Sequence, residues 1–405
     1  MGSAFDTFRK LGPAAFVLKA ILSVIVVDFL LLAFILLRRT YRKRYFATRD
    51  ARMLALREQW DALVSGEIPY SSWRRNTRER QLIEDMVLDA LEVAPPDESA
   101  RLLKFMRASG LVEKRILEAR HHRGWRRHRA LVALARTRAP EGIRALSEGL
   151  RDRDPETRLA ALRGLGQMAC PEAASEILNW VDDVGLVVPA LPLQSALIQT
   201  CAERPQVLLP HLEHADKSVC EVLARVVGEV ATPSLGPELM RFAGDELPEL
   251  RAAAARGLSY LNPNTAIDVL EELARDAVWF VRLRAVVSLA RIRNSATLPL
   301  LLRGLTDSNR LVRLRAGEGL VVFKTERVPI FDKVVSLHDQ YGLHAFLTAL
   351  ENSGAQASLV AEIKDCTGID CEKKQILVEV LATGKLAAAS IAPNQSVRAK
   401  VAAHS

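Results

Sequence analysis

The pattern of apolar and polar residues divides the 405-residue chain into one continuous apolar stretch and a long region with apolar positions at helical spacing. Residues 14–37 form an apolar run that only Lys19, Ser23 and Asp28 interrupt. At about 1.5 Å per residue such a helix reaches roughly 36 Å, whereas the hydrocarbon core of a membrane is about 30 Å thick. The run therefore predicts a membrane-spanning helix.

The flank of this run favours an uncleaved anchor. Five basic residues follow it directly: Arg38, Arg39, Arg42, Lys43 and Arg44. A signal peptide would have a shorter apolar region and end at small residues. Because Lys- and Arg-rich flanks stay in the cytoplasm, we expect a single-pass protein of the cell inner membrane with its soluble part cytoplasmic, although Arg9 and Lys10 oppose this orientation. The five basic residues either bind anionic lipid head groups or act only as the topology signal.

Asp28 is the one residue of the run that local physics does not explain. It lies within about four residues of the middle of the run, where a charge costs roughly 2.5–3.5 kcal/mol. In one interpretation Asp28 contacts a polar or basic group in the transmembrane helix of a partner or of a second copy. In the other, the anchor is marginally hydrophobic and Asp28 is protonated or hydrated. Lys19 is nearer the end of the run and can extend to the interface.

Similar segments recur every 31 residues in the part of the chain that follows the apolar run. A period of this length is typical of helical repeat proteins. The segments LRAAAARGL at 250–258, VRLRAVVSL at 281–289 and VRLRAGEGL at 312–320 align at this spacing, and the phase extends over seven units. One column of the alignment holds Arg127, Arg158, Pro189, Cys220, Arg251, Arg282 and Arg313. Six residues earlier stand His121, Asp152, Asp183, His214, Asp245, Asp276 and Asp307. Columns three and seven residues after the Arg column are small or apolar, with Ala in five of the seven units at the first.

Apolar columns at offsets of 3, 4 and 7 define one face of an α-helix, so each unit contains an inner helix. Pro140, Pro171 and Pro233 lie on the same grid before that helix, and proline is tolerated in a first helical turn. Each unit is therefore predicted to be a helical hairpin. The Asp-to-Arg spacing places a carboxylate in a connecting turn near a guanidinium, where bidentate pairing would tie neighbouring units together.

The pattern D-x5-R-x2-A-x3-L resembles the HEAT repeat, in the short form of bacterial and phycobilisome-lyase-like proteins, over residues 121–325. The resemblance implies an α–α superhelix, so together with the apolar run at 14–37 we expect an all-α chain with one N-terminal transmembrane helix followed by this superhelix. It also implies a structural ladder along the stack, formed by Asp152, Arg158, Asp245, Arg251, Asp276, Arg282, Asp307 and Arg313. The units that contain Pro189 and Cys220 lack the Arg, so we expect irregular packing there and a candidate partner site.

The domain limits follow from where the repeat fades. We expect a short tail at 1–13, the anchor at 14–37, a basic juxtamembrane helical adaptor at 38–120, the repeats at 121–325, capping helices at 326–387 and a disordered tail at 388–405. Within the adaptor, helices are expected at 49–64, 78–93 and 99–119, the last with a break at Gly110. Within the cap, they are expected near 330–336, 343–351 and 375–382.

Composition and charge agree with this organisation. Aromatic residues make up only 5% of the chain and apolar residues 49%, which argues against an all-β fold and against a disordered chain. The net charge of +8 is local, because residues 38–130 carry 22 basic and 13 acidic residues. Five scattered cysteines argue against a disulfide scaffold, so we expect reduced thiols.

Searching for catalytic motifs finds no phosphate loop, nucleophile elbow or zinc signature, so we assign no catalytic, cofactor or metal residue. The closest approaches to a metal site are two histidine groups, 121/122/128 and 211/214, and both lack further ligands. Cys366 and Cys371 match no standard metal-site spacing and are interpreted as buried or surface thiols without a ligand role.

Three functions compete at this stage. The leading one is a scaffold or adaptor that binds a membrane-associated protein partner, with anionic lipid at the basic flank, and regulates a membrane enzyme such as a polysaccharide glycosyltransferase. The alternative is an enzyme similar to the bilin lyases that contain short HEAT repeats. Nucleic-acid binding is disfavoured, because the basic surplus lies next to the membrane and aromatic residues for stacking are few. No small-molecule substrate is expected.

Overall fold

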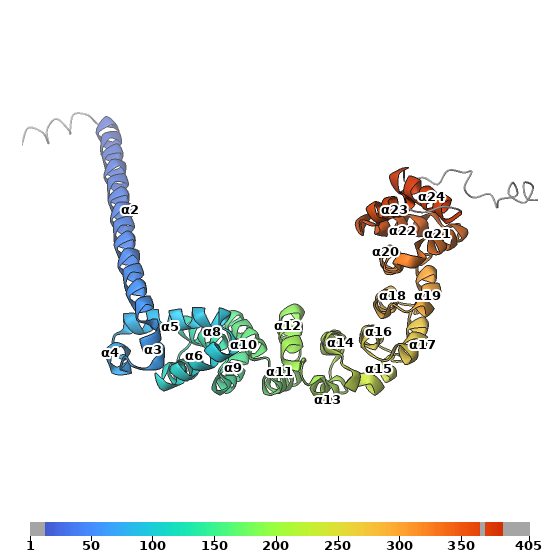
Figure 1. The fold of residues 1–405 in the computed structure, drawn as a ribbon. Coiled ribbons are helices and arrows are strands. Elements are labelled where there is room, and N and C mark those ends of the chain that lie inside the picture. Colours follow the sequence, from blue (N-terminus) through green and yellow to red (C-terminus); the bar gives the residue numbers. More distant parts are fainter. Residues whose placement is uncertain (1–12, 365–368, 384–405) are drawn as a thin grey trace, which may run out of the picture. The chain divides into compact units, whose positions relative to one another are not determined.

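The computed structural model describes residues 13–364 and 369–383, and within these ranges the secondary structure is helical with no strand. The chain forms two compact units, residues 1–114 and 115–405, which are considered separately. Figure 1 shows the order of the elements. The predicted all-α fold is confirmed.

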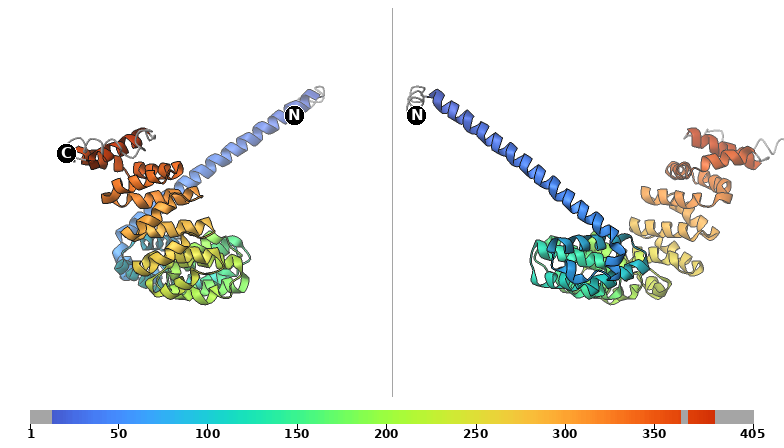
Figure 2. Two further views of the ribbon diagram at one scale, coloured as in Figure 1. Left: turned by 90° about the vertical axis from the view of Figure 1, so that its right-hand side faces the viewer. Right: turned by 60° about the vertical axis from the view of Figure 1, so that its left-hand side comes forward.

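The first unit contains one very long helix and a small bundle. Its helices are α2 (Pro13–Glu58), α3 (Trp60–Ser65), α4 (Tyr70–Arg74), α5 (Thr77–Val93) and α6 (Pro96–Ala108), and α7 (Leu111–His121) begins in it. We expected a separate helix over 49–64, but α2 continues without interruption to Glu58. The reason is that no Gly or Pro stands between Ala14 and Gly66, which ends α3 with a φ of +86°. Figure 2 shows α2 as one unbroken helix.

Aromatic side chains form the centre of the small bundle. The rings of Tyr70 and Phe105 lie 5.7 Å apart at an angle of 65°, and Trp73, which is 2% exposed, stands within 6.1 Å of both. Asn76 caps α5 by accepting the N–H groups of its first turn. The predicted break in the last helix of the adaptor is present at Gly110, where φ is +74°.

The second unit is a stack of helical hairpins, and in each hairpin an inner helix packs on the inner helix of the next. The inner helices are α8 (Trp125–Thr137), α10 (Pro155–Met168), α12 (Ala190–Cys201), α14 (Lys217–Val230), α16 (Pro248–Gly257), α18 (Trp279–Ile292), α20 (Arg310–Val321) and α22 (Gln340–Asn352). The outer helices are α9 (Ile143–Leu150), α11 (Pro171–Val184), α13 (Leu209–Leu212), α15 (Gly236–Phe242), α17 (Pro263–Leu273), α19 (Leu298–Gly304) and α21 (Arg327–Ser336).

The small residues of the repeat allow the two helices of a hairpin to approach closely. Ala161 of α10 is fully buried, and a Cβ added to Gly149 of α9 would lie 2.9 Å from its Cβ. Ala316 of α20 and Gly304 of α19 form the equivalent pair, again at 2.9 Å. In these two hairpins the alanine therefore packs against a glycine of the outer helix, at a distance that leaves no room for a larger side chain.

The stack extends beyond the predicted limit at residue 325, because α22 packs on α20 as the preceding inner helices pack on one another. Two further helices, α23 (Ala355–Lys364) and α24 (Ile369–Thr383), follow it, and α24 also contacts α21. The expected helices of the cap lie within α21, α22 and α24, whereas α23 was not anticipated. The expected disordered tail and Cys366 lie outside the described residues.

Candidate functional site

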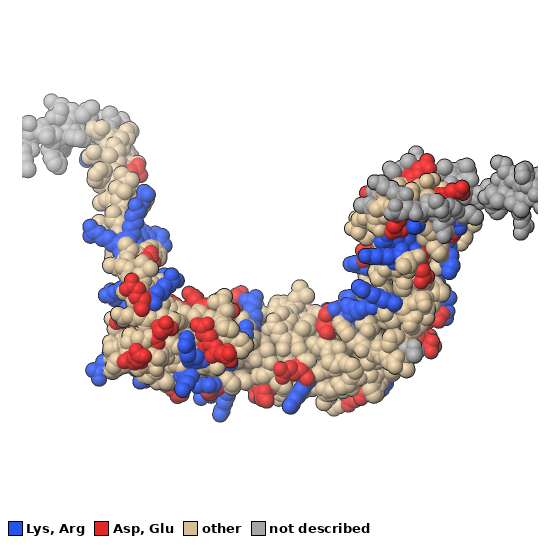
Figure 3. Space-filling view, viewed as in Figure 1, with Lys and Arg blue, Asp and Glu red and all other residues tan. Residues whose placement is uncertain are grey.

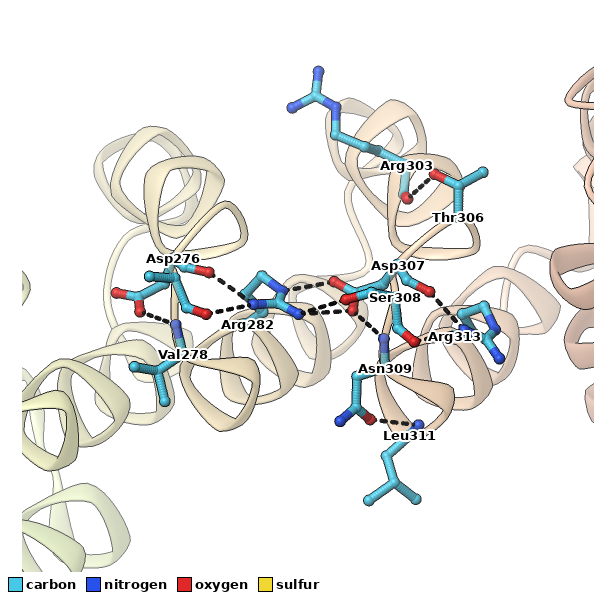
Figure 4. A network of polar contacts seen from close by, with 11 residues as sticks. Asp276, Val278, Arg282, Arg303, Thr306, Asp307, Ser308, Asn309, Leu311 and Arg313 are labelled. Atoms are coloured by element: carbon cyan, nitrogen blue, oxygen red, sulfur yellow. Dashed lines mark hydrogen bonds and ion pairs between the residues drawn. The ribbon is translucent and has the colours of Figure 1, made fainter.

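Arginine and aspartate side chains connect successive hairpins in the C-terminal half of the stack. Arg282 of α18 donates from Nε and Nη2 to the carboxylate of Asp307 at 2.7 and 2.9 Å. Its Nη1 donates to the backbone carbonyls of Asp276 and Ala277 in its own hairpin (Figure 4). Each such arginine thus joins one interhelical turn to the next turn along the chain.

Arg251 repeats this geometry one hairpin earlier. It pairs with Asp276 at 2.6 and 3.0 Å, and it also donates to two carbonyls in its own turn. Arg313 keeps the bonds to its own turn, but the next aspartate position holds His338, and the guanidinium lies 5.2 Å from the ring centre of Tyr341. We call the pairs Arg251–Asp276 and Arg282–Asp307 the ladder.

The ladder changes the titration of its members. Burial alone would raise the pKa of Asp276, but the hydrogen bonds from Arg251 and from the Val278 N–H, with the nearby positive charges, bring it below its usual value. The same balance lowers the pKa of Asp307, with Arg282 as the donor. The hydrogen bonds to these carboxylates raise the pKa of both Arg251 and Arg282. All four groups are therefore charged near neutral pH.

The N-terminal half of the stack contains an isolated pair of this type, Arg127 with Asp152 at 2.6 Å. Arg158 donates to the carbonyls of Asp152 and Arg153, but its Nε is buried without a partner in the described structure. The carboxylate of Asp183, which the spacing assigns to Arg158, pairs with Arg151 instead, at 2.8 Å.

Further along, the column holds Pro189 and Cys220, which have no guanidinium. The carboxylate of Asp245 accepts a hydrogen bond from the Leu247 N–H. It has no arginine partner from the preceding hairpin, because that position of the column is Cys220. The residues assigned from the resemblance thus occupy equivalent positions in their turns and helices, but only those from Arg251 to Asp307 form consecutive rungs.

A groove lies along the exposed face of the inner helices α14, α16, α18 and α20, and Gln194 of α12 also lines it. It consists of two hollows, of ≈ 310 Å³ and ≈ 850 Å³, which share Leu283 and Arg284. Six arginines line it: Arg225, Arg256, Arg284, Arg291, Arg293 and Arg315. Three glutamates line it: Glu229, Glu249 and Glu318. We call it the basic groove, and Figure 3 shows Lys and Arg side chains gathered along the edge of α18 and α20.

Most arginines of the basic groove have fixed partners. Arg256 forms an ion pair with Glu229 across α16 and α14, and Arg315 pairs with Glu318 at 2.6 Å within α20. Arg291 donates to the hydroxyl of Tyr260 at 2.8 Å and stacks on its ring. Neutral partners leave the positive charge of Arg291 uncompensated.

Arg284 differs from these residues, because no carboxylate among the described residues forms an ion pair with it. Desolvation lowers its pKa first of all, followed by the positive charge of Arg256, while Glu229 opposes the shift and Arg315 adds to it. Its guanidinium thus stands in a field of like charge at the point where the two hollows meet.

The basic groove was not predicted from the sequence, because the ladder and apolar columns that define the repeat face the interior of the stack. The groove residues lie in other columns of the same repeat: one full period separates Arg284 from Arg315, and the same period separates Arg225 from Arg256. Arginine recurring at the repeat period outside the ladder column was the signal available. Packing does not restrict the residue type at exposed positions of the repeat. The recurrence of arginine at these positions could therefore not be distinguished from chance.

The residues predicted to act at the membrane all lie on α2. Asp28 and the five basic residues Arg38, Arg39, Arg42, Lys43 and Arg44 are exposed within the first unit. Among the described residues, α2 is the one helix long and apolar enough to cross a membrane, with a mean hydropathy of 3.0 and none of that window buried. Figure 3 shows the band of Lys and Arg along α2 below a mostly uncharged stretch.

Cysteine and histidine side chains are dispersed. Cys201 is buried, and desolvation raises the pKa of its thiol to about 11, so it is protonated at neutral pH. His211 pairs with Asp182 at 2.5 Å. Over residues 13–364 and 369–383, no three His, Cys, Asp or Glu side chains come together in a way that could hold a metal ion.

The comparisons with known proteins identify the repeats. Residues 113–188 and 205–290 match the family model of HEAT repeats. These two segments are HEAT repeats, as the resemblance implied, and they lie within a longer superhelical array of helical hairpins. The segment between the two matches, 189–204, begins at Pro189 and contains α12. No curated protein matches the chain in sequence.

Several solved structures are similar to the chain. The Escherichia coli protein YibA has 18% identity and a TM-score of 0.33, covering 66% of this chain and 95% of its own. The CpcE–CpcF complex of phycocyanin lyase from Nostoc has 16% identity and a TM-score of 0.24, covering 63% and 94%. Kap121p has 13% identity and a TM-score of 0.36, covering 86% and 50%.

Proposed function

We propose that the protein is a membrane-anchored HEAT-repeat adaptor, which crosses the inner membrane once through α2 and binds a protein partner on the cytoplasmic side through the basic groove. The observation that carries the anchoring is the exposure of α2. Large apolar side chains from Val17 to Leu37 are more than half exposed, and burial of this surface in lipid would be strongly favourable. The basic residues that follow favour the cytoplasmic orientation.

The basic groove supports the binding of a protein. HEAT stacks are extended surfaces on which several hairpins contribute to one site. The groove combines uncompensated positive charge with the exposed ring of Trp279, and arginine and tryptophan are among the residues most enriched at interaction hot spots. A membrane enzyme such as a polysaccharide glycosyltransferase is one partner class to test.

Extraction of membranes at alkaline pH tests the anchor. We expect the full chain to stay in the pellet and a variant lacking residues 14–37 to be soluble. A matched variant with Gln at Arg38, Arg39, Arg42, Lys43 and Arg44 should stay in the pellet, because the apolar run is intact. Release of the full chain would contradict the anchor, and activity of a C-terminal reporter in the periplasm would contradict the orientation.

Photo-crosslinking from Val27 tests whether Asp28 contacts a partner within the membrane. We expect one membrane-protein adduct, lost in Asp28→Leu, because the carboxylate would be the group that the partner recognises. Lipid adducts alone would show that α2 only tethers the protein. The binding role would then belong to the basic groove alone.

A further inference from the structure

We propose that the basic groove binds an acidic, partly apolar segment of the partner in extended conformation, with one of its carboxylates paired to Arg284. This inference rests on the proposed adaptor function and specifies its partner chemistry. Six arginines and three glutamates line the groove, so its net formal charge is +3. A segment that carries negative charge would neutralise this net positive charge.

Arg284 is the central point at which that charge is needed, and Arg291 and Arg293 also line the groove without an ion pair to a carboxylate of the described residues. Arg256 and Arg315, its basic neighbours on α16 and α20, already have Glu229 and Glu318 as partners. Arg284 has no ion-pair partner among the described residues, and it lies where the two hollows join. A planar guanidinium donates two parallel hydrogen bonds to a carboxylate, so an acidic side chain fits this position better than a neutral one.

Apolar side chains beside Arg284 indicate which residues flank the carboxylate in the bound peptide. Trp279 is 42% exposed and its ring packs edge-on against Phe280 at 6.0 Å, on one side of Leu283. Val287 and Val322 line the other hollow. A large aromatic ring left open to water beside a charged groove is suited to an aliphatic or aromatic side chain of a peptide.

The interleaved glutamates argue for a peptide and against a nucleic acid. A phosphate backbone would place negative charges along the whole groove, against Glu229, Glu249 and Glu318. A peptide can place its few carboxylates at the arginines alone. The C-terminal segment of this chain is no suitable occupant, because residues 384–405 contain no Asp or Glu.

The groove also fixes the length of the segment. Its arginines extend from Arg225 on α14 to Arg315 on α20, which is three spacings between neighbouring inner helices. With about 8–10 Å per spacing, this charged part of the groove spans roughly 24–30 Å, and an extended chain covers about 3.3 Å per residue. The bound segment is therefore about seven to nine residues long.

Selection from a random peptide library displayed on phage tests the inference, with the full chain held in phosphatidylcholine nanodiscs. We expect the selected peptides to be enriched in Asp and Glu next to Leu, Phe or Trp. Binding of a selected peptide, measured by fluorescence anisotropy, should weaken about tenfold or more in Arg284→Glu, since a charge-assisted hydrogen bond is replaced by repulsion. Substituting Gln for the acidic residues of the peptide should weaken it similarly.

The matched control is Arg144→Glu on the outer helix α9, where the side chain is 83% exposed and lies outside the groove. Its affinity for the selected peptide should equal that of the wild type. Unchanged far-ultraviolet circular dichroism of Arg284→Glu would show that the stack is intact.

Two results would overturn the inference: selected peptides without acidic enrichment, or equal affinity of Arg284→Glu for the selected peptide. Displacement of that peptide by oligothymidine at equal or lower concentration would also overturn it, in favour of nucleic acid. The membrane pellet assay separates this failure from that of the adaptor function, since Arg284→Glu should remain membrane-bound in every case.

Discussion

Two stretches of the same stack hold their hairpins together in different ways. From Arg251 to Asp307, each turn is bonded to the next through a bidentate arginine–aspartate pair. From Arg158 to Asp245, all of which the structure describes, the hairpins stack without such pairs, and apolar packing joins the inner helices α10, α12, α14 and α16. The comparison shows that the ladder is not required for stacking. Where the ladder occurs, its hydrogen bonds fix the position of each interhelical turn relative to the next.

The largest expected effect comes from removing a rung. Arg282→Gln should destabilise α18 and α20 by about 2–4 kcal/mol, because it leaves the 10%-exposed carboxylate of Asp307 unpaired and loses two carbonyl bonds. Hydrogen exchange measured by mass spectrometry would report this locally. Arg158→Gln is the matched change in the irregular stretch, and its loss should be only about 1 kcal/mol. Equal losses of stability in Arg282→Gln and Arg158→Gln would mean that the ion pair with Asp307 contributes no stability beyond that of the hydrogen bonds to the backbone carbonyls.

The next largest effect should come from disturbing the close packing of inner helices in the stretch from Arg158 to Asp245, where the ladder is absent. A Cβ added to Gly166 of α10 would lie 2.9 Å from the backbone Cα of Ala196 in α12. Gly166→Ala should therefore destabilise this stretch by about 1–2 kcal/mol, despite the higher helix propensity of alanine.

Thermal unfolding followed by circular dichroism would measure the Gly166→Ala loss. Gly142→Ala serves as the control, because the nearest side-chain atom is 3.5 Å away from the added methyl group. Tolerance of Gly166→Ala would show that α10 and α12 can separate without cost.

Much of this comparison could be predicted from the sequence. The repeat period located the inner helices, and the substitutions at 189 and 220 located the irregular stretch, because buried columns impose strict periodicity. The pairing of Asp183 with Arg151 in place of Arg158 could not be predicted, since partner choice depends on how far neighbouring turns lie apart. The basic groove was missed for the opposite reason, because its exposed columns vary freely.

Acid should weaken the laddered stretch selectively. The folded-state pKa values of Asp276 and Asp307 are lowered, so their stabilising contribution is present above the unfolded pKa of about 3.9 and is lost as the pH falls through the folded values. The effect should be smaller than that of Arg282→Gln, because a protonated carboxyl still accepts a hydrogen bond.

Melting temperatures between neutral and acid pH would measure this loss. Asp307→Asn has no titrating group at that position, so its stability should start lower and decline less on acidification. An equal decline in wild type and Asp307→Asn would show that other groups control the acid response.

The smallest expected effect is a gain from adding a rung. Cys220→Arg would place a guanidinium one repeat before Arg251, at the same separation from Asp245 that joins Arg251 to Asp276. We expect a stabilisation of about 1 kcal/mol, seen as slower hydrogen exchange in α14 and α16. Cys220→Ser controls for loss of the thiol. Faster exchange in Cys220→Arg would mean that the buried surroundings of Cys220 cannot admit the longer side chain.

The uninterrupted helix α2 has a mechanical consequence for an anchored adaptor. Its last part, from Arg38 to Glu58, follows the apolar run without a hinge and extends about 31 Å. With the anchoring proposed above, this helix would limit how far from the bilayer the small bundle at its end can reach, and it would resist bending toward the lipid surface. A partner would have to present its binding segment within that reach, so an enzyme with a long cytoplasmic domain is a better match than one that ends at the membrane.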